Sequence, residues 1–143
     1  MNRIEKFEDI LAWQKARELT REVYQCAKAG AFARDFGLRD QIQRASVSTM
    51  ANIAEGFDRG GDREFLQFLS NSKGSCGEVK SHPYVALDQQ YIVQKEFDLL
   101  YGQADEVSRL VGGFMGLSET IQPARPKIQI SLTTQDPRPK TQD

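Results

Sequence analysis

Histidine, cysteine and long apolar runs are scarce in this 143-residue sequence. It has a single histidine, His82, and two cysteines, Cys26 and Cys76, which are too few for a disulfide scaffold and lack the spacing of metal ligands. A di-iron or dimanganese bundle needs a Glu and a His three residues apart on each of two helices. The lone His82 lies four residues from Glu78. We therefore expect no metal ion and no other cofactor.

Signatures of catalysis and of membrane insertion are also missing. No glycine-rich loop ends in Lys-Ser or Lys-Thr, as a phosphate-binding loop would, and nothing in the sequence pairs with His82 in the way that a catalytic partner does. No stretch approaches the roughly 20 apolar residues that span a membrane. Glu8 and Lys15 interrupt the first apolar run, which therefore does not resemble a signal peptide. The sequence predicts a cytoplasmic, non-membrane protein that is not an enzyme.

The sequence has little excess of either charge. Its 19 Lys and Arg residues nearly balance 20 Asp and Glu residues, for a formal net charge of -1 and a pI of about 5.9. This balance argues against a protein whose whole surface grips nucleic acid, although it leaves room for a local basic patch. The length fits one domain, and 39% hydrophobic content is ordinary for a soluble globular protein.

Four stretches of the sequence show the apolar spacing of amphipathic helices. The first follows a predicted N-cap at Asp9 and reaches about residue 28, and the others cover about residues 36–57, 62–91 and 94–117. Asp35 and Asp62 are predicted to cap the second and third helices, and Pro83 should kink or break the third. We therefore predict an all-α fold, an up-down-up-down antiparallel four-helix bundle over residues 1–117.

The composition changes after residue 117. Four prolines stand among Gln, Thr, Lys and Asp, a composition that predicts a disordered C-terminal tail over residues 118–143. Within it, Ile128, Ile130 and Leu132 alternate with other residues, as in a strand that could add to a partner. The prolines and the absence of a neighbouring strand favour disorder.

The second predicted helix is apolar or small on two faces. Besides its core stripe it carries Val47, Met50, Ala51 and Ala54, and no charged residue lies between Arg44 and Glu55. A helix of this kind should be buried on both sides. One face can form the monomer core, and these four residues are then a predicted interface with another subunit. The sequence thus predicts a homo-oligomer.

Small residues also fill the middle of the third predicted helix. Because a mid-helix glycine costs roughly 1 kcal/mol relative to alanine, Gly74 should serve close packing. We expect the second and third helices to be the closest pair. Gly74→Leu should then overpack their contact and lower the free energy of unfolding by about 1–3 kcal/mol. Gly56, Gly60 and Gly61 should end the second helix and form the turn between the two helices.

The first predicted helix has a basic and aromatic face. Because each helical residue turns the chain by about 100°, Arg17, Arg21 and Lys28 fall on one side, with Trp13 and Tyr24 beside them. One interpretation is a solvated charged face with two aromatics at the core edge, and the other is a surface for nucleic acid or a partner chain.

On the second helix, Asp40 and Arg44 have the spacing of a helical ion pair. This spacing assigns Arg44 to an intrahelical pair rather than to a ligand.

The sequence resembles a known family of four-helix bundle proteins, those associated with intervening sequences of bacterial 23S ribosomal RNA genes, sometimes labelled S23 ribosomal protein. The resemblance covers roughly residues 7–117 and rests on the segments LAWQKARELTREVY, LRDQIQRASVSTMANIAEGF, REFLQFL, KGSCGEV and ALDQQYI. It implies a homopentamer around a central channel and no catalytic residues. The family also includes accessory proteins of diversity-generating retroelements, which bind a reverse transcriptase and nucleic acid.

Two hypotheses follow for the function. The first is a non-enzymatic oligomeric module that binds RNA or a ribonucleoprotein through the face formed by Trp13, Arg17, Arg21, Tyr24 and Lys28. The alternative is a protein-interaction scaffold, or a retroelement-type accessory protein that binds a reverse transcriptase. The acidic balance of the chain disfavours the retroelement branch, whose accessory proteins tend to be basic.

Overall fold

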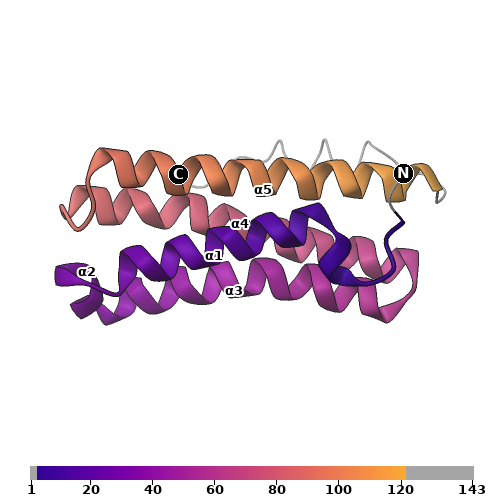
Figure 1. Ribbon diagram of the computed structural model, residues 1–143, viewed down its shortest axis with the longest axis horizontal. Helices are drawn as coiled ribbons and strands as arrows, with labels where there is room; N and C mark the ends of the chain where they lie inside the picture. The colour runs from indigo at the N-terminus through magenta and orange to yellow at the C-terminus, as the bar shows by residue number, and fades with distance from the viewer. Residues whose placement is uncertain (1–2, 122–143) are drawn as a thin grey trace, which may run out of the picture.

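Helices account for nearly all of the described chain (Figure 1). The computed structural model describes residues 3–121, with side chains up to residue 117. The elements in chain order are the 3-10 turn η1 (Phe7–Asp9) and the helices α1 (Leu11–Ala27), α2 (Gly30–Arg34), α3 (Phe36–Arg59), α4 (Asp62–Asp88) and α5 (Gln94–Ile121). Residues 3–121 contain five α-helices and no strand, which confirms the all-α class. Helix α5 extends to Ile121, four residues into the predicted tail, so the predicted boundary after residue 117 is wrong. The rest of the predicted tail, from residue 122 onward, lies outside the described residues.

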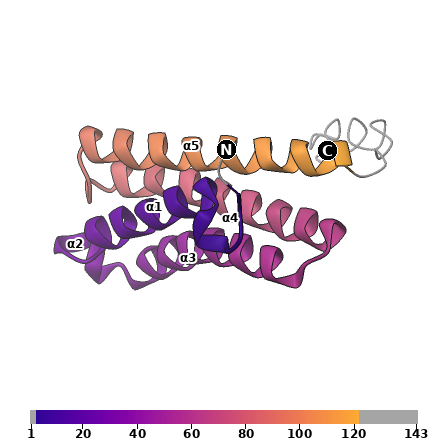
Figure 2. The same ribbon diagram turned by 45° about the vertical axis from the view of Figure 1, so that its right-hand side comes forward.

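The four long helices lie side by side and enclose one apolar core (Figures 1 and 2). The helix pairs in contact are α1 with α3, α3 with α4, α4 with α5, and α5 with α1, and α3 with α4 is the most extensive. Buried side chains come from every long helix, including Leu19, Ile53, Leu69 and Leu100. These residues lie on the predicted apolar stripes, so the periodicity of the sequence located the core correctly.

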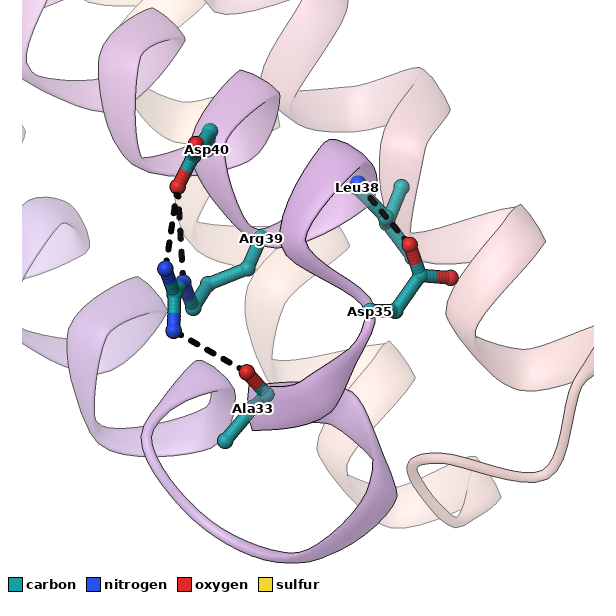
Figure 3. A network of polar contacts seen from close by, with 5 residues as sticks. All are labelled: Ala33, Asp35, Leu38, Arg39 and Asp40. Carbon is teal, nitrogen blue, oxygen red and sulfur yellow. Dashed lines mark hydrogen bonds and ion pairs between the residues drawn. The ribbon is translucent and has the colours of Figure 1, made fainter.

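The predicted N-cap of α3 is confirmed (Figure 3). The Asp35 carboxylate accepts a hydrogen bond from the backbone N–H of Leu38 at 3.1 Å. Close by, Arg39 donates to the carbonyl oxygen of Ala33 at 3.0 Å and lies 3.4 Å from the Asp40 carboxylate. These contacts fix the junction between the short helix α2 and the long helix α3.

The two other predicted N-caps are wrong. Asp9 accepts hydrogen bonds from the backbone N–H groups of Glu5 and Lys6 at 3.0 and 3.2 Å, so it closes the η1 turn instead of capping α1. These bonds favour the carboxylate and lower the pKa of Asp9. Asp62 lies inside the first turn of α4, because Gly61 occupies the N-cap position.

Pro83 does not break the third long helix. Helix α4 continues from Asp62 to Asp88 with Pro83 inside it and buried. The ring of His82 makes hydrogen bonds to the Glu78 carbonyl oxygen and to the Gln41 side chain of α3. Core burial of the proline ring and this side-chain link to α3 accompany the uninterrupted helix. The chain leaves the helix after Asp88, a few residues before the predicted end.

Hydroxyl groups, and not the mid-helix glycines of α4, connect α3 with α4. Ser72 donates to the carbonyl oxygen of Thr49 at 2.7 Å, and both residues are fully buried. The hydroxyls of Ser48 and Ser75 lie 2.9 Å apart on the same seam. The predicted closeness of these two helices is therefore confirmed, with small polar side chains bridging them.

The predicted role of Gly74 is wrong. Gly74 is exposed, and a Cβ added there would meet no atom within 4 Å. The close approach is at Gly56, where an added Cβ would lie 2.5 Å from the Cβ of Phe68 and 3.0 Å from Phe65. Gly56 therefore does not end its helix. Helix α3 runs on to Arg59, and Gly60 ends it with a φ of 88°.

Candidate nucleic-acid interface

The predicted basic row lies on the exposed side of α1. The side chains of Arg17, Arg21 and Lys28 are all exposed, while Ala16, Leu19 and Val23 of the same helix are buried. Within residues 3–117, none of the three cations forms an ion pair with a carboxylate. The structure thus places the three cations together on one exposed face, which fits both interpretations of this face.

The two aromatic residues of this face differ in accessibility. Trp13 is half-buried, with the ring of Phe7 packed edge-on at 5.2 Å and the Arg17 guanidinium carbon 5.9 Å from its ring centroid. This arrangement is a cation–π contact, which occupies part of the indole surface. Tyr24 is 42% exposed. The structure therefore leaves Tyr24 as the more accessible ring for stacking.

Two of the nearby carboxylates, those of Glu18 and Asp40, lie against other cations. Glu18 lies 3.6 Å from Lys15 and so does not neutralise the basic row directly. The predicted pair between Asp40 and Arg44 is wrong, because the Asp40 carboxylate lies against Arg39 instead. Within the described part of the chain, Arg44 has no ion-pair partner. One more cation thus joins the candidate interface than the sequence indicated.

Arg44 and Tyr24 face a common groove between α3 and α1. The groove has a volume of about 420 Å³ and is also lined by Asp40, Gln43 and Val47. The sequence analysis missed Arg44 because it placed this residue in an intrahelical pair. The adjacent Arg39, which competes for the same carboxylate, was the signal that could have corrected it.

Three of the four predicted interface residues lie on an open face of α3. Val47 is 42% exposed, Ala51 is exposed and Ala54 is partly exposed. Met50 instead packs into the seam with α1, where its sulfur lies 3.5 Å from the Thr20 hydroxyl. Because Val47 also lines the groove of Tyr24, the predicted subunit interface and the basic face adjoin each other.

The two cysteines are not among the residues of this interface, and both have a raised pKa. Desolvation raises the pKa of both thiols, Cys26 and Cys76, to about 11, so both are protonated at neutral pH. The Cys76 thiol donates to the carbonyl oxygen of Ala104 at 3.1 Å. The described residues include no group of three or more His, Cys, Asp or Glu side chains placed to hold a metal ion. Across residues 3–121, no helix combines the length and the apolar character needed to cross a membrane.

Comparison with known proteins places the chain in a family. The family model of the 23S rRNA-intervening sequence protein matches residues 8–113, which is well over half of the sequence. The chain belongs to this family. The match covers α1 to α4 and most of α5, including the whole basic face of α1, and it confirms the resemblance noted in the sequence.

A solved structure shares the fold of this 23S rRNA-intervening sequence family member. It is a crystal structure of a protein with unknown function from the S23 ribosomal protein family of Bacteroides thetaiotaomicron. The two structures align with a TM-score of 0.67 and 18% sequence identity, over 73% of this chain and 98% of that chain. At this identity the likeness shows the fold alone. A search of curated proteins finds no match.

Proposed function

We propose that this protein is a non-enzymatic, oligomeric RNA-binding module whose ligand is an RNA or a ribonucleoprotein. One observation supports the proposal most: Arg17, Arg21 and Lys28 are exposed on one face of α1, and none has a carboxylate partner within residues 3–117. The family takes its name from intervening sequences of 23S rRNA, which makes RNA the first ligand to test.

The chemistry of the face suits a single-stranded or looped RNA. The cations of α1, together with Arg44 of α3, would hold phosphate oxygens and release counterions from the RNA. Tyr24 would stack on an unpaired base, as aromatic side chains do in single-strand binding. Trp13 would act through Arg17, whose guanidinium already lies over its ring. Four cations on one subunit imply weak, salt-sensitive binding.

Assembly would strengthen such weak binding. We infer that the subunit is an up-down-up-down antiparallel four-helix bundle that forms a homo-oligomer, a pentamer in the form that the family resemblance implies. The open α3 face with Val47, Ala51 and Ala54 is the proposed contact, because it exposes apolar side chains that gain from burial. A ring repeats the basic face, and one RNA that spans several copies gains avidity.

The RNA proposal predicts a selective effect of the basic row. The triple variant Arg17→Ala, Arg21→Ala and Lys28→Ala should lose most of its RNA affinity in fluorescence anisotropy at low salt. The slope of log K against log salt concentration should become less steep by about 2, because each phosphate of a single strand that a cation neutralises contributes roughly 0.7 to that slope.

A matched triple variant controls for net charge. Arg63, Lys73 and Lys95 are exposed on α4 and α5, so replacing all three by Ala removes the same charge from other helices. This control should bind RNA like the wild type. Equal losses in the two triple variants, or no binding by the wild type at low salt, would contradict the proposal and favour the protein-interaction scaffold.

The assembly proposal predicts that Ala51→Glu dissociates the oligomer. A carboxylate in the centre of the α3 face would be buried without a partner, while its exposed position in the subunit leaves the helix intact. Light scattering after gel filtration should show subunits, and circular dichroism should show unchanged helicity. Ser70→Glu on the exposed side of α4 is the control and should leave the mass unchanged. A monomeric wild type at micromolar concentration would contradict the assembly.

A further inference from the structure

An apolar groove lies where the N-terminal segment meets the last turns of α5. Figure 1 shows the start of α1 and the end of α5 at the same end of the bundle. The groove has a volume of about 430 Å³. Aliphatic residues and one phenyl ring make up most of its lining, and Arg109 is the one charged residue that residues 3–117 contribute to it. The groove is separate from the basic face of α1, none of whose residues line it.

Several of the apolar side chains in this groove face water. Leu11 is 51% exposed at the start of α1, and Ile4, in the segment before it, is 39% exposed. Leu110 and Phe114, which also line the groove, are only partly buried. An open groove with a mainly apolar lining can take up apolar side chains of another segment, which removes them from water.

The chain that follows α5 is within reach of the groove. Helix α5 ends its described part at Ile121, one helical turn or about 6 Å beyond Leu117. The six residues 122–127 can span roughly 20 Å when extended. Pro123 and Pro126 in this stretch disfavour further helix and favour an extended path. A segment that begins at residue 128 can therefore fold back onto the groove.

The segment after this linker has the pattern that the groove requires. Ile128, Ile130 and Leu132 alternate with Gln and Ser, so an extended chain presents all three aliphatic side chains on one side. They are the largest aliphatic side chains in residues 122–143.

We propose that residues 128–132 of the same chain dock into this groove through the side chains of Ile128, Ile130 and Leu132. The contact joins the C-terminal segment to both the N-terminal segment and the last turns of α5. The short linker gives an intramolecular contact a high effective concentration, which compensates for the small size of the docked segment.

Paramagnetic relaxation measurements test this contact in the full chain. A nitroxide attached to Gln135→Cys would lie three residues beyond Leu132. The raised pKa of the two native thiols slows their labelling at neutral pH, which directs the label to the new cysteine. We expect strong loss of methyl signal from Leu11 and Leu110 in the groove. The methyl signals of Leu38 and Ile92, near the starts of α3 and α5, should persist.

Two variants separate docking from chance proximity. Replacing Ile128, Ile130 and Leu132 by Ser should restore the methyl signals of Leu11 and Leu110. Leu11→Gln, which changes an exposed groove residue without touching the core, should restore the methyl signal of Leu110. Replacing Gln129 and Ser131 by Ala alters the opposite side of the segment and should leave the signal loss in place.

Mixed samples identify the occupant. One protein in the mixture carries the nitroxide at natural isotope abundance, and the other is isotopically enriched and carries no nitroxide. Signal loss in this mixture reports only contacts between molecules. Signal loss at Leu11 in this mixture would assign the groove to a second copy and overturn docking within one chain. Equal signal loss in the wild type and in the triple Ser variant would also overturn it, since proximity would then not depend on the aliphatic side chains.

Discussion

Gly56→Ala should destabilise the bundle by up to about 2 kcal/mol, although alanine is a better helix former than glycine. The new Cβ would lie 2.5 Å from the Cβ of Phe68 and 3.0 Å from a ring carbon of Phe65. Such overpacking typically costs about 1–3 kcal/mol, which exceeds the gain of about 1 kcal/mol in helix propensity. Urea unfolding followed by far-ultraviolet circular dichroism, which reports helix content, measures the difference.

Gly74→Ala is the matched control and should have the opposite sign. The same methyl group at position 74 meets no atom within 4 Å, so only the propensity gain of about 0.5–1 kcal/mol remains. A stabilised Gly56→Ala protein would mean that Phe65 and Phe68 can move aside. A destabilised Gly74→Ala protein would mean that this face of α4 is covered in the folded protein.

The contrast between these two glycines marks the limit of prediction from sequence. Helical periodicity placed most of the core correctly because it depends only on spacing within one element. The buried side chains of Leu66 and Val111 lie outside the predicted stripes. It could not show which glycine meets another helix, since that depends on the relative position of α3 and α4. Gly56 packs on the phenylalanines of the first turns of α4, whereas Gly74 faces outward.

Surface charges were harder to predict than the core for a similar reason. The spacing of Asp40 and Arg44 favours an intrahelical pair, but the neighbouring Arg39 holds the same carboxylate while it also bonds to Ala33 of α2. A tertiary contact thus overrides a weak local preference. The exposed basic row of α1 was predictable from the sequence, whereas the addition of Arg44 required the packing of α1 on α3.

Asp35→Ala should weaken the end of the bundle where α2, α3 and the α4–α5 connection meet. Removal of the N-cap hydrogen bond to Leu38 costs about 0.5–2 kcal/mol in comparable helices. The second carboxylate oxygen of Asp35 accepts a hydrogen bond from the Tyr91 hydroxyl at 2.9 Å. The variant therefore also breaks the contact between the α2–α3 junction and the α4–α5 connection. The Tyr91 ring also stacks on Phe32 of α2, with 5.6 Å between ring centroids.

Two further variants separate the N-cap hydrogen bond to Leu38 from the hydrogen bond to Tyr91. Asp35→Ser keeps an N-capping oxygen but is too short to reach the tyrosine hydroxyl, so it should recover most of the stability that Asp35→Ala loses. Tyr91→Phe removes only the link. In a double-mutant cycle, Asp35→Ser and Tyr91→Phe should show a measurable coupling, because both remove the same bond. Additive effects would mean that this bond contributes nothing to stability.

The same hydrogen bond predicts a decrease in stability at high pH. The bond to Asp35, followed by desolvation and the carboxylate charge, raises the pKa of Tyr91 above its ordinary value of 10.0. A group whose pKa is raised by folding contributes stability below its unfolded pKa and loses that contribution as pH rises through its folded pKa. The free energy of unfolding of the wild type should therefore decline above about pH 10, and the decline should be smaller in Tyr91→Phe. An identical decline in both proteins would assign it to the other tyrosines or to lysines, and would show that Tyr91 is not held by Asp35.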